Sequence, residues 1–156
     1  MTAMNYIEAP HECAGSGTAV FLAGGISDCE NWQSQIACAL QPIDVTVLNP
    51  RRAFYPDHDE LENQRQIEWE HRHLRRADVV VFWFPPQTLC PIALFELGVC
   101  CASGKPIVVG ADPQYARRFD LKTQIALHRP QVAIADSLEG FIVQIRNHAV
   151  VRRGSS

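Results

Sequence analysis

Residues 79–104 read VVVFWFPPQTLCPIALFELGVCCASG, and Glu96 is the one charged residue among these 26. The run Val79–Phe84 predicts a strand covered on both faces, because such strands are continuously hydrophobic. Pro85-Pro86 breaks the run, and Pro91 suits the first turn of a following helix. Burying an unpaired carboxylate costs free energy or forces a shift of its pKa. We therefore place the chemistry of this protein at Glu96.

Strand and helix patterns alternate along the rest of the chain, which is typical of a parallel α/β sheet with right-handed crossovers. We predict one doubly wound domain, flavodoxin-like or Rossmann-like, with helices on both faces of five parallel strands in the order 2-1-3-4-5. It covers residues 18–150, between a flexible leader (1–17) and a tail (151–156). The expected strands are 18–23, 44–48, 78–84, 107–110 and 131–135, and the expected helices are 30–40, 59–76, 91–104, 115–127 and 136–148.

The charge and the apolar runs argue against two classes of partner. A net charge of −3 gives no electrostatic footprint for a nucleic-acid polymer. A membrane span needs roughly 20 consecutive apolar residues. The best candidate stretch is interrupted by Pro85-Pro86, Pro91 and Glu96. We expect neither a nucleic-acid nor a membrane partner.

The cysteines and histidines do not form a metal motif. The six cysteines show no CxxC spacing, and His71 and His73 do not share a helix face. The first 17 residues also lack the basic-then-apolar order of a signal peptide. We therefore predict a cytoplasmic protein with reduced thiols and no bound metal.

Glu70 is a second acid in an unexpected place. It shares one face of the predicted helix with residues of which the large ones are apolar, so we expect it to face inward or toward the sheet edge. The alternative is that Glu70 pairs with Arg51 or Arg52 and only fixes a loop. The positions on this face are Asn63, Ile67, Glu70, Leu74 and Ala77.

Three loops follow predicted strands directly, namely those at Gly24-Gly25, Asn49-Pro50-Arg51 and Pro85-Pro86. Doubly wound sheets bind ligands outside the carboxyl ends of their strands, so these loops border the expected crevice and Glu96 comes within its reach. The glycine pair matches neither a dinucleotide fingerprint nor a P-loop. It offers close backbone approach to a flat or anionic ligand. An ordinary tight turn is the alternative.

Five segments together resemble the nucleoside 2-deoxyribosyltransferase family, in particular its divergent "-like" branch. They are FLAGGI (21–26), NPRR (49–52), QIEWE (66–70), ADVVVFWF (77–84) and PIALFELG (91–98). The resemblance implies that Glu96 is the nucleophile and that Glu70, eight residues before Asp78, contacts the sugar. The better-known branch carries an aspartate six residues before the nucleophile, where this chain has Cys90.

The resemblance implies N-glycosidic bond chemistry on nucleosides. The expected reaction transfers a (deoxy)ribosyl group between bases through a glutamyl-glycosyl intermediate, without a cofactor. An N-glycoside hydrolase acting on nucleosides or nucleoside 5′-monophosphates is one alternative, which Arg51 and Arg52 favour. A non-catalytic nucleotide-binding or sensing module is another.

The implied partners are a nucleoside or nucleotide, a free base and further copies of the chain in a homo-oligomer. A neighbouring subunit closes the site in the family, and Asp120 and Gln124 are the candidates for that role here. Gly24, Gly25 and the Phe82–Pro85 rim would sandwich the base. The predicted catalytic residues are Glu96 and Glu70, and the predicted substrate-binding residues are Gly24, Gly25, Ile26, Asn49, Arg51, Trp83 and Pro85.

Overall fold

A computed structural model gives the fold and describes residues 3–56 and 59–153 of the 156. These residues form six strands and five helices. In chain order they are β1 Asn5–Glu8, β2 Ala19–Gly24, α1 Trp32–Leu40, β3 Thr46–Asn49, α2 Glu60–Arg76, β4 Val79–Phe84, α3 Pro91–Ser103, β5 Ile107–Ala111, α4 Arg118–His128, β6 Ile134–Ala135 and α5 Leu138–Arg153.

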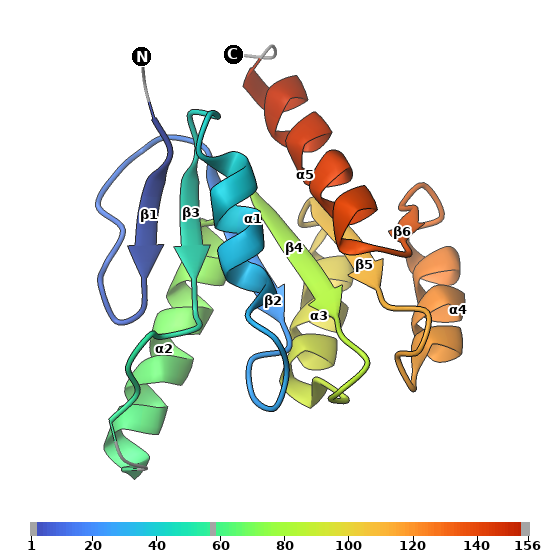
Figure 1. Ribbon diagram of the computed structural model, residues 1–156, viewed down its shortest axis with the longest axis horizontal. Coiled ribbons are helices and arrows are strands. Elements are labelled where there is room, and N and C mark those ends of the chain that lie inside the picture. The colour runs from blue at the N-terminus through green and yellow to red at the C-terminus, as the bar shows by residue number, and fades with distance from the viewer. Residues whose placement is uncertain (1–2, 57–58, 154–156) are drawn as a thin grey trace.

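The strands form a single parallel sheet in the order β1-β3-β2-β4-β5-β6 (Figure 1). The predicted doubly wound α/β class is confirmed, but the prediction of five strands was wrong. The additional strand, β1, lies within the stretch that we predicted to be a flexible leader. It pairs with β3 from Asn5↔Thr46 to Glu8↔Asn49. Four residues at a half-exposed edge are too few to show a strand pattern in the sequence.

Helices cover both faces of the sheet, with α1 and α5 on one face and α2, α3 and α4 on the other (Figure 1). Successive side chains of β4 point to opposite faces, as the period of a strand requires. Phe82 and Phe84 therefore pack beneath α2–α4, while Val81 and Trp83 pack beneath α1 and α5. All six β4 residues are buried, which explains the unbroken apolar run.

The last helix extends further than predicted. α5 continues to Arg153, so residues 151–153 belong to the helix and not to a tail. The remainder of the predicted tail (154–156), residues 1–2 of the leader and residues 57–58 of the loop before α2 lie outside the described residues.

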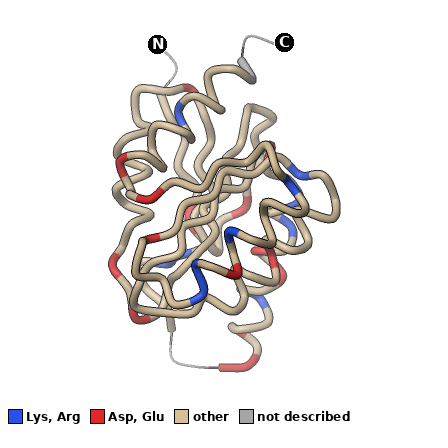
Figure 2. Tube along the Cα trace, turned by 90° about the vertical axis from the view of Figure 1, so that its right-hand side faces the viewer, with Lys and Arg blue, Asp and Glu red and all other residues tan. Residues whose placement is uncertain are grey.

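In the view of Figure 2, Lys and Arg positions lie among Asp and Glu positions along the described trace. In the described ranges, no helix combines the length and the apolar character that crossing a membrane requires.

Candidate active site

The carboxyl ends of the central strands border a cavity of about 360 Å³, which we call the carboxylate cavity. β2 and its loop supply one wall, and α2 supplies Glu70. The first two turns of α3 supply Ile92 and Glu96, and Cys90 lies directly before this helix. Gly24, Gly25 and Ile26 line the same cavity. Segments far apart in the sequence thus place two acids and a glycine turn around one space.

Both acids are poorly solvated, and Glu70 also raises the pKa of Glu96. Burial, and then the nearby charge of Glu70, raise the pKa of Glu96 from 4.5 to about 8. Burial raises the pKa of Glu70, while the hydrogen bond from Gln66 lowers it. Among the described residues, no ion pair includes either acid. At neutral pH the pair therefore retains a proton, and Glu96 is the acid on which it is favoured.

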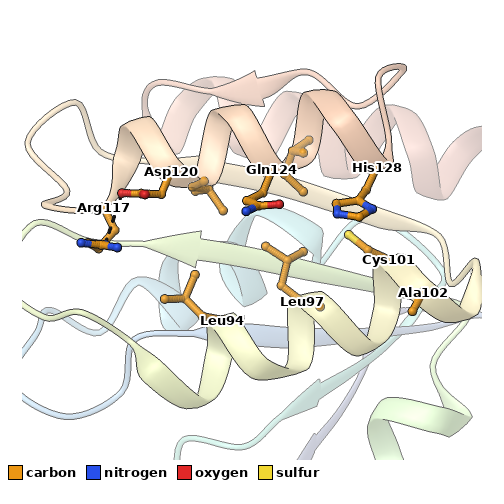
Figure 3. A pocket seen from close by; sticks show the side chains of 11 residues that line it. Leu94, Leu97, Cys101, Ala102, Arg117, Asp120, Gln124 and His128 are labelled. Carbon is orange, nitrogen blue, oxygen red and sulfur yellow. Dashed lines mark ion pairs between the residues drawn. The ribbon is translucent and has the colours of Figure 1, made fainter.

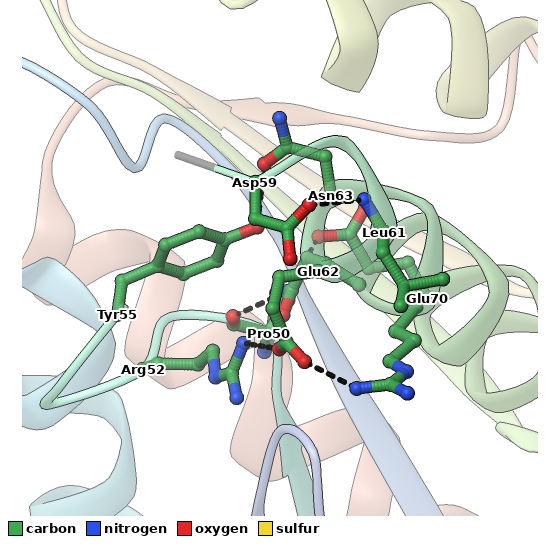
Figure 4. A network of polar contacts seen from close by, with 10 residues as sticks. Pro50, Arg52, Tyr55, Asp59, Leu61, Glu62, Asn63 and Glu70 are labelled. Atoms are coloured by element: carbon green, nitrogen blue, oxygen red, sulfur yellow. Dashed lines mark hydrogen bonds and ion pairs between the residues drawn. The ribbon is translucent and has the colours of Figure 1, made fainter. Parts of the chain in front are cut away.

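Arg52, two residues after Pro50 of the cavity wall, does not neutralise Glu70. Arg52 lies 3.4 Å from Glu62 and stands over the ring of Tyr55, 4.9 Å from its centroid (Figure 4). The alternative in which Glu70 merely pairs with Arg51 or Arg52 is therefore not what the structure contains. Glu70 instead accepts a hydrogen bond from Gln66.

The predicted face of α2 was wrong in part. Ile67, expected to be inward, is 64% exposed, and the buried residues of the helix are Trp69, His73 and Leu74. Glu70 lies at the border of this buried face, where it reaches the cavity. The Trp69 ring packs against Phe21 of β2 with ring centroids 6.1 Å apart, and this aromatic contact turns the Trp69 side of the helix toward the sheet.

Arg51 and Asn49 hold loops together and do not line the carboxylate cavity. The Arg51 guanidinium donates to the carbonyls of Cys29 (3.0 Å) and Glu30 (2.8 Å) and to Gln33 Oε1 (3.1 Å). It borders an adjoining cavity of about 840 Å³, the loop cavity. Asn49 is 3% exposed; it donates to Tyr6 Oη (2.8 Å) and accepts from the Arg51 backbone N–H (2.9 Å).

Trp83 does not line the carboxylate cavity. The prediction that it forms part of an aromatic rim around the base is therefore not met. Trp83 is 4% exposed and packs against Phe141 of α5, on the opposite face of the sheet. The alternation of side chains along β4 requires this orientation. Pro85 reaches the site only indirectly, by packing its ring against Gly25.

Two side chains of α1 hold the turn at Gly24-Gly25 in place. The Gly25 carbonyl accepts hydrogen bonds from Trp32 Nε1 (2.8 Å) and Gln33 Nε2 (3.0 Å), which anchor the turn to the start of α1. Gly24 has a φ of +137°, a backbone conformation that residues with a Cβ rarely adopt. A Cβ at Gly24 would lie 2.2 Å from the Trp83 carbonyl oxygen on the neighbouring strand.

We expect Gly24→Ala to destabilise the fold by roughly 2–4 kcal/mol, through the left-handed φ and this backbone clash. Gly98→Ala is the matched control, because Gly98 is exposed within α3 and a Cβ there meets nothing within 4 Å. It should stabilise by about 0.5–1 kcal/mol, the helix-propensity difference. Urea unfolding measures both changes, and equal effects of the two substitutions would contradict the role of Gly24.

Two further residues of the site were not predicted. Gln66 borders the loop cavity and contacts Glu70, which stands four residues later on the same helix face. The spacing of four residues between Gln66 and Glu70 was the signal in the sequence from which this contact could have been predicted. Cys90 lines the carboxylate cavity, and burial first raises the pKa of its thiol, to about 12, so it is not an activated nucleophile.

Asp120 and Gln124 lie elsewhere. Figure 3 shows both on α4, across a groove from Leu94 and Leu97 of α3. Asp120 pairs with Arg117 at 3.3 Å. Their predicted role at the site of a neighbouring subunit stays a prediction. In the part of the chain that the structure describes, no cluster of three or more His, Cys, Asp or Glu side chains is arranged to hold a metal ion.

Two of three comparisons place the chain among known proteins. Comparison with curated proteins gave no match. A crystal structure of a conserved protein from Enterococcus faecalis V583 superposes with a TM-score of 0.57 at 14% identity, over 85% of this chain and 99% of that one. This likeness shows the fold alone. A family model described as "nucleoside 2-deoxyribosyltransferase like" matches residues 17–115, more than half of the chain, and the match includes Gly24, Glu70 and Glu96. The chain therefore belongs to the nucleoside 2-deoxyribosyltransferase-like family.

Proposed function

We propose that this protein transfers a (deoxy)ribosyl group between nucleobases, with Glu96 as the nucleophile. The observation that carries the proposal is the pair of carboxylates in one cavity, where, among the described residues, Glu96 and Glu70 have no cation within ion-pair distance. A retaining glycosyl transfer uses a buried carboxylate in this way. A purely structural acid would be expected to have a cationic partner.

In the proposed reaction, the ionised Glu96 carboxylate attacks C1′ of the nucleoside. The C1′–N bond breaks, its electron pair goes to the departing base, and the base takes up a proton from solvent. A glycosyl ester of Glu96 remains. A second base then attacks C1′ from the side that the first base left, loses its proton and releases Glu96 as a carboxylate. Glu70, in its ionised form, would accept hydrogen bonds from the sugar hydroxyls.

The engagement of the arginines favours a nucleoside over a nucleoside 5′-monophosphate as the substrate. Arg51 already donates to three oxygens of the loop and of α1. Arg52 pairs with Glu62. A phosphate would have to displace one of these contacts and approach two acids. The feature that favoured the monophosphate hydrolase is thereby weakened.

A base-exchange assay tests the proposal. The protein is incubated with a panel of nucleosides, with and without a free acceptor base, and the products are separated by chromatography. New nucleosides with ping-pong kinetics are the expected result. Free sugar released at the same rate with or without the acceptor would indicate hydrolysis instead. Tight ligand binding without any product would identify a binding module.

A further inference from the structure

Gln66 links two parts of the site through one side-chain amide. Its Nε2 donates both to the backbone carbonyl of Pro50 (2.8 Å) and to Glu70 Oε1 (2.9 Å). Pro50 belongs to the loop after β3, and it lines both the carboxylate cavity and the loop cavity. The amide thus joins that loop to the second acid of the pair.

The orientation of the amide follows from its neighbours. Both N–H groups of Gln66 are used by oxygens, whereas its Oε1 is buried and has no hydrogen-bond partner in the described structure. Turning the amide over would place Oε1 against two acceptor oxygens, which is less favourable than one unsatisfied carbonyl. Gln66 therefore approaches Glu70 as a donor only.

A donor stabilises the ionised form of a carboxylate. The other charged and titratable groups around Glu70 do not supply such a contact. Glu96 of α3 is itself an acid, Arg51 and Arg52 are engaged elsewhere, and His71 and Arg75 line a neighbouring cavity with Glu70 but form no ion pair with it in the described ranges. Burial raises the pKa of Glu70, and the contact that lowers it is the one from Gln66.

We propose that Gln66 is a positioning residue, which holds the Glu70 carboxylate in its ionised form and in fixed orientation toward the sugar site. The kinetic part of this proposal rests on the proposed transfer reaction. The electrostatic part does not, because the charge state of Glu70 can be observed without turnover.

The test replaces Gln66 by Met, which keeps the length of the side chain and removes both donors. Glu70 loses the contact that favours its anion, so its titration midpoint should rise by about one pH unit. Carboxyl ¹³C NMR of glutamate-labelled protein measures this midpoint, with Glu70→Gln identifying the signal. In the exchange reaction, the acid limb of the kcat/KM profile should move to higher pH, because the form with both acids ionised becomes rarer.

The chain offers a matched control in Gln64→Met. Gln64 Nε2 donates to Glu68 Oε1 at 2.7 Å with the same spacing of four residues, but this pair is exposed. The substitution Gln64→Met should change neither the titration midpoint of Glu70 nor the pH profile of kcat/KM. Gln66→Lys serves as the rescue variant, because its ammonium again donates to Glu70 and should return the midpoint to the wild-type value or below.

The outcomes separate the two proposals. An unchanged or lowered Glu70 midpoint in Gln66→Met would overturn the role of Gln66, whether or not the protein is active. A raised midpoint in a protein that exchanges no base would support the role of Gln66 and count against the transfer reaction. If Gln66→Met fails to fold by circular dichroism, the comparison is made with Gln66→Lys. A midpoint in Gln66→Lys that is higher than in wild type would then overturn the proposal.

Discussion

Replacing Glu96 by Gln is expected to lower kcat/KM for base exchange by at least about a thousandfold, while the fold is retained. The amide keeps the shape of the side chain but cannot form the glycosyl ester. The remaining activity would come from binding and orientation alone. Chromatographic measurement of exchange over a range of nucleoside concentrations gives the ratio. Mass spectrometry of acid-quenched wild-type protein should also find the sugar on the peptide that contains Glu96.

The control for this substitution is Glu139→Gln, in the exposed first turn of α5 on the other face of the sheet. It makes the same exchange of a carboxyl for an amide at an exposed position and should leave base exchange unchanged. Exchange that persists in Glu96→Gln at the wild-type rate would remove Glu96 from its proposed role.

The second large effect is a dependence of the reaction on pH. Because the pKa of Glu96 is raised to about 8, the attacking carboxylate is the minor form at neutral pH. We expect kcat/KM to rise about tenfold per pH unit, and thus roughly a thousandfold between pH 5 and pH 8, before it levels off. Initial rates at subsaturating nucleoside, in buffers of equal ionic strength, give the profile.

The substitution Glu70→Gln tests whether the pH profile arises from the titration of Glu96. It removes the neighbouring charge, which is the second cause of the raised pKa of Glu96. The acid limb should therefore move to lower pH, even though the maximal rate falls because the sugar has lost a contact. This shift is opposite in direction to that expected for Gln66→Met. If the acid limb of the kcat/KM profile stays at the same pH in Glu70→Gln, the limb arises from the titration of a group other than Glu96.

The sequence drew attention to Glu96, which lines the carboxylate cavity, because a single charge in an otherwise apolar stretch is a strong local signal. The centre of the sheet was equally accessible, since β2, β4 and β5 each have a clear hydrophobic run. The edge strand β1 gave no such signal. Its pairing with β3 depends on tertiary contacts, such as the one between Tyr6 and Asn49, which no local pattern reveals.

The substrate-contacting residues were harder to predict because residue type does not determine direction. Asn49 and Arg51 have the chemistry of ligand-binding residues, yet their polar atoms hold the loops in place. Trp83 belongs to a fully buried strand. Side chains alternate between the two faces of β4, and the position of Trp83 in this alternation directs it to the face away from the cavity. Such distinctions depend on side-chain geometry, whereas the sequence provides only the order of the residues.

The burial of Glu96 also has a consequence for handling the purified protein. Its carboxyl binds a proton more tightly in the folded protein (pKa about 8) than in the unfolded chain, where the usual value of 4.5 applies. The contribution of this group to stability is therefore greatest at pH values below about 4.5, and it declines as the pH rises to about 8. Mildly acidic buffers should thus favour storage and crystallisation, whereas the alkaline buffers that suit an assay should lower the melting temperature. Melting temperatures measured by thermal shift over a series of pH values should fall with rising pH in wild type. The fall should be smaller in Glu96→Gln.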